Sequence, residues 1–187
     1  MSRIFHAAPV TLYLRPAALF ACAHNFKEGE RVAPVGVAER GELTLNQGDI
    51  GYRDWNSARL SGKVGVVLHV AGRLSAKDLN KGISDAIAAA RLPADKFQAT
   101  TIINTDDAIP GSAIFVRRSL ESTKKATPPS VFVLDDSGAA QRAWRLQPGG
   151  SAVVVLDKDG RIRFAKDGAL TADEVRQVMS LLHTLLT

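Results

Sequence analysis

The sequence has 187 residues, of which 45% are apolar, 23% charged and 6% aromatic, with a single cysteine. This length suits one domain whose core is large enough to fold without a metal or disulfide staple. One cysteine excludes an internal disulfide, a dithiol redox pair and any site of the C-x-x-C type. The 24 basic and 19 acidic residues give a net charge of +5, too small an excess to indicate nucleic-acid binding.

Residues 1–23 have the composition of a secretory signal peptide. They contain two arginines, no acidic residue and an apolar stretch, and they end in Ala21-Cys22-Ala23, which fits the A-x-A cleavage pattern. Cleavage there makes His24 the first residue, leaves 164 residues and lowers the net charge to +3, because the removed segment holds two positive charges. The apolar part is too short for a permanent membrane anchor. We therefore expect a periplasmic protein without a transmembrane anchor or a cysteine.

Two alternatives for this segment stay open. Arg15-Pro16 interrupts the apolar stretch, so the segment can also be an ordinary buried strand or helix. Leu19-Phe20-Ala21-Cys22 resembles a bacterial lipobox, in which Cys22 is lipidated and becomes the first residue, although Phe20 is bulkier than that motif usually accepts.

Residues 24–60 form an N-terminal extension, and residues 61–187 form the main domain of a single structural unit. Within the extension, the pattern predicts a β-hairpin with strands over 35–38 and 42–45, parted by Arg40-Gly41. The main domain opens with an almost continuously apolar run, 64–71, as expected for a strand covered on both faces.

Strands and helices then alternate along the chain. Ser75 is placed to cap a helix that ends at Leu92-Pro93, and the last helix begins with a capping box of Thr171 and Glu174. Between them we expect strands over 98–104 and 130–134, a basic helix over 112–125, a short segment around Trp144, and a hairpin of strands 152–156 and 161–165 about the turn 157–160. Parallel crossovers followed by an antiparallel hairpin are typical of the thioredoxin-like α/β fold, a mixed β-sheet with helices on both faces.

Several motifs support this assignment by resemblance. The segments 62–71 and 153–161 resemble those of exported thiol-disulfide oxidoreductases and peroxiredoxins. The chain is more similar to the YtfJ family of bacterial periplasmic proteins, which it resembles at 40–43, 55–58, 71–73, 104–112, 119–125 and 156–161. The resemblance covers the whole chain after residue 23 and implies a thioredoxin-like fold in the periplasm rather than an activity.

The residues of the oxidoreductase site are absent. Aligned without gaps on the oxidoreductase pattern, Leu74 and Lys77 stand where the two cysteines of C-x-x-C would be, and Ser151 stands at the usual cis-proline. Disulfide exchange and peroxidase chemistry both need a thiolate. We therefore expect neither activity, unless Cys22 is retained.

The candidate ligand site is the turn after the first parallel strand. Gly72 allows close approach of the backbone, Ser75 is the expected cap, and Arg73 and Lys77 bring two positive charges to the positive end of a helix dipole. An anion or an acidic partner would relieve that repulsion. Alternatively, Arg73 and Lys77 are two solvated residues of a surface turn.

Asp106 and Asp107 follow the next parallel strand and therefore belong to the same carboxyl edge of the sheet, where ligands of open α/β folds bind. They could hold a hard cation, pair with Arg73, or serve only in a turn.

Asp157 and Asp159 indicate a turn rather than a calcium loop. We interpret His69, His183, Trp55 and Trp144 as structural residues, with a partner surface as the alternative for the tryptophans.

These observations favour a non-redox binding or partner-interaction module of the periplasm, with its site at the edge formed by residues 71–77 and 104–112. We assign no catalytic residue, metal or cofactor. The alternative is a cysteine-free enzyme in which Arg73 and Lys77 hold an anionic substrate and Asp106 or Asp107 is the general base. A third possibility, nucleic-acid binding by the basic helix, is opposed by export and by Glu121 within the basic run.

Overall fold

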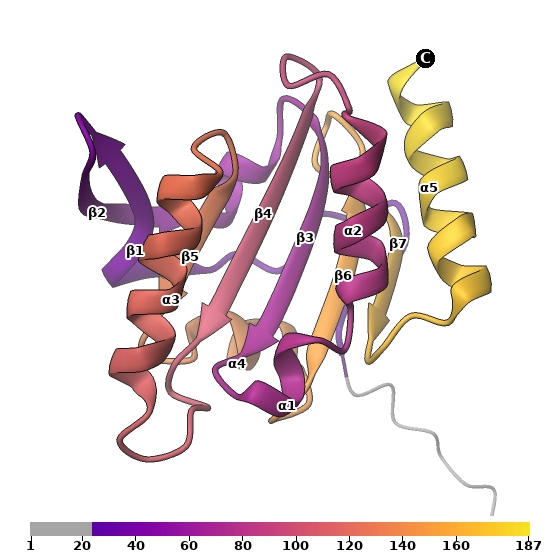
Figure 1. Ribbon diagram of the computed structural model, residues 1–187. Coiled ribbons are helices and arrows are strands. Elements are labelled where there is room, and N and C mark those ends of the chain that lie inside the picture. Colours follow the sequence, from indigo (N-terminus) through magenta and orange to yellow (C-terminus); the bar gives the residue numbers. More distant parts are fainter. Residues whose placement is uncertain (1–23) are drawn as a thin grey trace, which may run out of the picture.

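A seven-stranded mixed sheet carries the whole fold in the computed structural model, which describes residues 24–187 (Figure 1). The strands lie in the order β2-β1-β5-β4-β3-β6-β7. Their bounds are β1 Gly36–Asn46, β2 Asp49–Asn56, β3 Val64–Ala71, β4 Phe97–Asn104, β5 Val131–Asp135, β6 Ser151–Leu156 and β7 Ile162–Asp167. The strands β3, β4 and β5 are parallel, whereas β6 and β7 form an antiparallel hairpin. The predicted order of crossovers and hairpin is confirmed.

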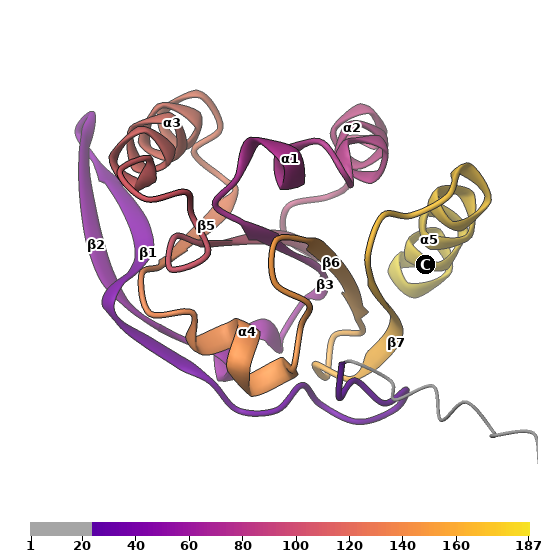
Figure 2. The ribbon, with the colours of Figure 1, turned by 90° about the horizontal axis from the view of Figure 1, so that it is seen from below.

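Helices cover both faces of this sheet (Figure 2). The helices α1, α2, α3 and α5 lie on one face, and α4 lies on the other together with the N-terminal segment. Their bounds are η1 Ser57–Leu60, α1 Leu74–Lys77, α2 Lys81–Ala90, α3 Ala113–Ala126, α4 Ala139–Trp144 and α5 Ala172–Leu186. The predicted capping box of Thr171 and Glu174 starts α5.

The central strands form two cores because their side chains alternate between the faces. In β3, Val64, Val66 and Leu68 pack towards α2 and α5, while Val67 packs towards α4. All residues of β3 except Val70 are buried, as the continuous apolar run predicts for a strand covered on both sides.

The predicted position of the N-terminal hairpin is wrong. Residues 36–46 form one strand, and the turn lies at Gln47-Gly48, where both residues have a positive φ. Gly41 is a bulge within β1, because the pairing with β2 shifts register between Val37 and Glu42. A Cβ atom at Gly41 would collide with the carbonyl oxygen of Arg53. This glycine is therefore required by a bulge, although in the sequence it resembles a turn residue.

The extension belongs to the same sheet as the main domain, since β1 pairs antiparallel with β5. The segment before β1 is also anchored. The backbone N–H of Asn25 donates to the Trp144 carbonyl at 3.1 Å, and the ring centroids of Phe26 and Trp144 lie 5.7 Å apart. Trp55 and Trp144 are both buried, so they act in packing rather than at a surface. The predicted signal segment and its cleavage position lie outside the described residues, apart from His24.

The first helix of the main domain is broken, contrary to the prediction of one helix capped by Ser75. Ser75 lies inside the four-residue α1, and Arg73 occupies the N-cap position without a side-chain cap. Asn80, which is buried, separates α1 from α2. Its side-chain amide donates to Ser151 Oγ at 2.9 Å and to the Gly168 carbonyl at 3.2 Å, and its oxygen accepts from the Leu170 N–H at 2.9 Å. Asn80 therefore ties the helix break to β6 and to the start of α5.

We predict that Asn80→Ala lowers the free energy of unfolding by about 1–3 kcal/mol, because it leaves buried polar groups without partners. Chemical denaturation of the full chain measures this loss. The control is Gln177→Ala, which removes an exposed amide from α5 and should change stability by less than about 0.5 kcal/mol. Equal stabilities of the two variants would contradict this role of Asn80.

Candidate functional site

Three loops meet at the carboxyl edge of β3 and β4, and the Arg73–Asp107 ion pair joins them. The guanidinium of Arg73 lies 2.5 Å from Asp107 Oδ1, and its Nε donates to the Asp107 carbonyl at 2.8 Å. The other carboxylate oxygen of Asp107 accepts from the Gly149 N–H. The alternative in which Asp107 pairs with Arg73 is thus the arrangement present, and the chain's own carboxylate supplies the negative charge beside Arg73.

Gly72 makes the close approach that the sequence indicates. Its N–H donates to the Asn104 carbonyl at 2.8 Å, and a Cβ atom there would lie 2.9 Å from the same oxygen. Gly72, Arg73 and Asp107 therefore come together. Asp106 is exposed, and its carboxylate lies near Gly138 rather than beside Arg73.

Ser75 and Lys77 are exposed on α1, which is too short for a helix dipole of useful size. No carboxylate within residues 24–187 forms an ion pair with Lys77. Arg73 is thus already neutralised, whereas the ammonium of Lys77 remains available to an outside anion.

The geometry gives Asp107 a structural role, because both of its oxygens accept hydrogen bonds and its side chain is only 9% exposed. A general base needs an oxygen open to substrate. Across the described chain, no cluster of three or more His, Cys, Asp or Glu side chains is placed to hold a metal ion.

Next to this edge lies a hollow of about 620 Å³ between α2 and α3, which we call the α2–α3 hollow. Its floor includes a cross-strand row, Leu68, Thr101 and Phe132, which are paired in register on β3, β4 and β5. One wall is a stripe of α3. Arg73, Lys77, Ile109 and Ser112 line the end of the hollow at the carboxyl edge of β3 and β4, and we call this end the mouth. The lining residues are Leu68, Val70, Ala71, Gly72, Arg73, Leu74, Lys77, Ser84, Thr101, Ile103, Ile109, Ser112, Phe115, Val116, Ser119, Leu120, Thr123 and Phe132.

The hollow exists because the two helices pack on different partners. The helix α2 contacts α5, while α3 contacts β1 and β5, so the outer face of β4 lies between them. Both views of the ribbon show α2 and α3 set apart over the sheet (Figures 1 and 2). This hollow is not among the features predicted from the sequence. The signal that could have found it is the stripe of small and apolar residues Ser112, Val116, Ser119 and Thr123 at helical spacing on α3.

The hollow is lined by apolar side chains, hydroxyl groups and two cations. Among residues 24–187, no acidic residue, cysteine or histidine lines the hollow, and the charged groups of the lining are Arg73 and Lys77. Large apolar side chains are exposed at the rim: Leu74 is 84% exposed, Phe115 66% and Ile109 58%. Exposed apolar surface around a concavity is typical of an interaction site.

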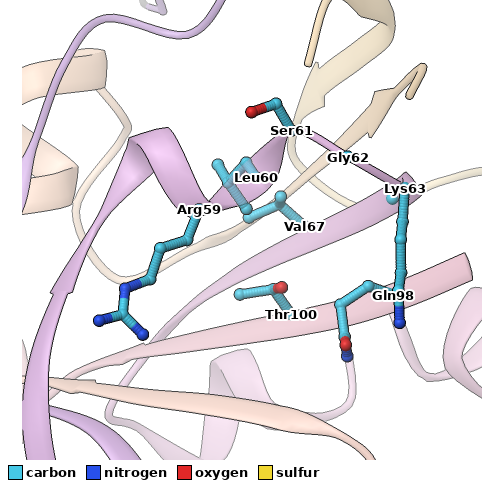
Figure 3. Close-up of a pocket in the computed structure, with 9 residues that line it drawn as sticks. Arg59, Leu60, Ser61, Gly62, Lys63, Val67, Gln98 and Thr100 are labelled. Carbon is cyan, nitrogen blue, oxygen red and sulfur yellow. The ribbon is translucent and has the colours of Figure 1, made fainter. Parts of the chain in front are cut away.

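A second hollow, of about 280 Å³, lies at the opposite ends of β3 and β4 (Figure 3). Figure 3 shows Arg59 and Lys63 on its two sides. Arg59 pairs with Glu42 at 3.2 Å, and Lys63 donates to the Ala94 carbonyl at 2.7 Å. Its cations therefore already have partners within the protein.

The basic helix α3 does not present one positive face. Lys124 is buried, and its ammonium donates to the carbonyls of Pro128 and Ser130 at 2.7 and 2.8 Å. Burial lowers the pKa of Lys124 below its usual value. Arg117 lies 3.9 Å from Glu121. These basic residues therefore serve the helix end and an ion pair.

His69 points to the face of the sheet opposite the α2–α3 hollow and is 5% exposed. Its Nε2 atom has no hydrogen-bond partner in the described chain. Burial lowers the pKa of His69 to about 4, against the opposing charges of Asp135 and Asp107. His69 is therefore neutral at pH 7. His183, in contrast, is exposed on α5.

The sheet order and the helices on both faces define a thioredoxin-like fold. The chain aligns with the structure of a thiol-disulfide isomerase from Corynebacterium glutamicum with a TM-score of 0.55 and 20% identity, covering 83% of this chain and 97% of that one. At this identity the similarity concerns the fold alone.

The match to a protein family is more specific than the similarity of fold. The family model described as "Bacterial protein of unknown function (YtfJ_HI0045)" matches residues 26–185, and the chain belongs to this YtfJ family. It is 57% identical to the "Uncharacterized protein YtfJ" of Escherichia coli (strain K12), over 90% of this chain and 91% of the relative. It is 42% identical to an "Uncharacterized protein" of Haemophilus influenzae, over 87% and 89% of the two chains. The resemblance noted in the sequence is confirmed.

We predict that His69 makes the protein less stable as the pH falls from about 6.5 to 4. In this window the unfolded chain binds a proton at His69 and the folded chain does not, so the loss reaches about 3 kcal/mol. Denaturant unfolding of the full chain at several pH values measures it. His69→Leu should flatten this part of the profile, whereas His183→Leu, on the surface, should not. An unchanged slope in His69→Leu would contradict the prediction.

Proposed function

We propose that the chain is an exported, non-redox binding protein that holds a small anionic ligand at the edge formed by residues 71–77 and 104–112. The observation that carries this proposal is the lining of the α2–α3 hollow, which is apolar, hydroxylic or cationic throughout. A site that binds an anion needs a positive group and an accessible concavity, and both are present at Lys77.

The same lining argues against catalysis at this edge. Nucleophilic catalysis by a serine or threonine needs an adjacent base, and the hydroxyl groups of the hollow have no histidine or carboxylate among the lining residues. Asp107, the carboxylate at the same edge of the sheet, is held by Arg73 and Gly149. Binding is therefore the function that these residues support best.

The position of Leu74 supports a non-redox role. On the oxidoreductase pattern this position carries the attacking cysteine, and here an apolar side chain projects into solvent, 84% exposed. A leucine cannot form a mixed disulfide, but it can contact a bound molecule.

The periplasm is the compartment that the sequence of residues 1–23 supports. These residues combine two arginines with an apolar stretch and the A-x-A pattern. Within residues 24–187, no helix has both the length and the apolar character needed to cross a membrane.

The binding test is NMR titration of the full chain with sodium acetate. We expect the amide signals of residues 71–77 to shift at millimolar acetate, because Lys77 offers an unpaired ammonium. Lys77→Gln should abolish these shifts. Lys81→Gln, which removes a neighbouring exposed lysine that pairs with Asp85 outside the hollow, should retain them. Acetate that leaves the amides of residues 71–77 unmoved would refute the anion site.

The redox test is reduction of insulin by dithiothreitol in the presence of the full chain. We expect no acceleration, because Cys22 is the only thiol and no second cysteine can resolve a mixed disulfide. Cys22→Ala should behave like the unaltered chain. Acceleration that disappears in Cys22→Ala would show a redox role and defeat this part of the proposal.

A further inference from the structure

We infer that the α2–α3 hollow binds the hydrocarbon tail of an amphiphilic carboxylate, a fatty-acid-like anion whose head group pairs with Lys77 at the mouth. This inference rests on the proposed function and identifies the ligand class of that site. Neither the fold nor the resemblance to the family implies such a ligand.

The floor and one wall of the hollow suit a hydrocarbon chain. Leu68, Thr101 and Phe132 form a continuous row across three strands, and Val70 and Ile103 form a second row beside it. On α3, Val116 and Leu120 face the same space. Apolar side chains on a sheet face are normally covered by a helix. Among residues 24–187, only the single turn of α1 lies between α2 and α3, at one end of the hollow (Figure 2), so an apolar ligand would complete the layer.

The charges of the hollow select the head group. The lining carries two cations and no anion, and Arg73 is paired with Asp107, which leaves Lys77 to meet a carboxylate. Lys77 lies at the mouth, where its ammonium and the head group would both remain in contact with water. An amphiphile with a positive head group would meet only repulsion there.

The size of the hollow is that of a small-molecule site. Ligand pockets commonly measure about 300–1,000 Å³, and the hollow measures about 620 Å³.

The test is calorimetric titration of the full chain with butyrate, hexanoate, octanoate and decanoate below their micellar concentrations. We expect Kd to fall by about fourfold for each added methylene, since each one moves from water into the hollow. Decanol should bind more weakly than decanoate because it lacks the negative head group, and decylammonium should bind more weakly than decanol. A Kd that does not depend on chain length would overturn the inference.

Two matched variants of α3 locate the tail. Ser119 lines the hollow and Ser122 does not, and both are exposed on the same helix. Ser119→Trp should fill the hollow and weaken decanoate at least tenfold, while Ser122→Trp should bind as the unaltered chain does. Thermal unfolding of both variants checks that they are folded. Equal binding by the two variants, whether weakened or intact, would place the tail elsewhere and refute the inference.

The head group is tested separately. Lys77→Gln should weaken decanoate by about threefold to tenfold and leave decanol unchanged, whereas Lys81→Gln should alter neither. If acetate shifts the amide signals of residues 71–77 but Kd does not depend on the chain length of the carboxylate, the anion site stands and only the inference of an amphiphilic ligand is refuted. Tight binding of an amphipathic helical peptide together with failure of decanoate would likewise replace the amphiphile with a protein partner.

Discussion

The side chain of Asn80 is the constraint on which the site depends. Asn80 follows the single turn of α1 and holds the start of α2 through hydrogen bonds to Ser151 on β6 and to Gly168 and Leu170 before α5. These partners lie on the side of β3 away from β4, so α2 begins on that side and packs against α5. The outer face of β4 is left between α2 and α3 as a consequence. One buried amide thus links the helix break to the packing of α2 on α5, beside which the hollow lies.

The Arg73–Asp107 ion pair is the second constraint, and it decides which positive charge at the edge is available to a ligand. Two adjacent cations on a helix start suggest an anion site with both as ligands, but Asp107 crosses from the neighbouring loop and binds Arg73 and the Gly149 N–H. Because three loops are joined by one carboxylate, the mouth of the hollow is held in place before any ligand arrives. Preorganisation of this kind lowers the cost of binding. The positive charge left to a ligand is that of Lys77.

The sequence predicts the sheet well and the site only in part. Local signals that act within a few residues, such as the buried run 64–71, the turn 157–160 and the capping box at Thr171, identify their elements correctly. The errors arise where a residue serves a distant partner. Gly41 resembles a turn residue but is a bulge opposite Arg53, and Asn80 breaks a helix because of contacts 71 to 90 residues away. The hollow is likewise a product of packing between α2, α3 and α5: the stripe of small residues on α3 marks one wall of it in the sequence, but nothing local shows that α2 packs against α5.

Because residues 24–187 contain no cysteine, this edge of the fold carries no thiol. A thioredoxin-like sheet delivers the turn after β3 to the surface, and in an oxidoreductase that exposure serves a thiolate. In this chain the exposed position is Leu74, with Ile109 and Phe115 also at the rim. An apolar side chain kept in water costs free energy unless contact with another molecule removes it from the solvent. The rim, the apolar floor and the ammonium of Lys77 are together the basis on which we propose a ligand that is hydrophobic along most of its length and negative at one end.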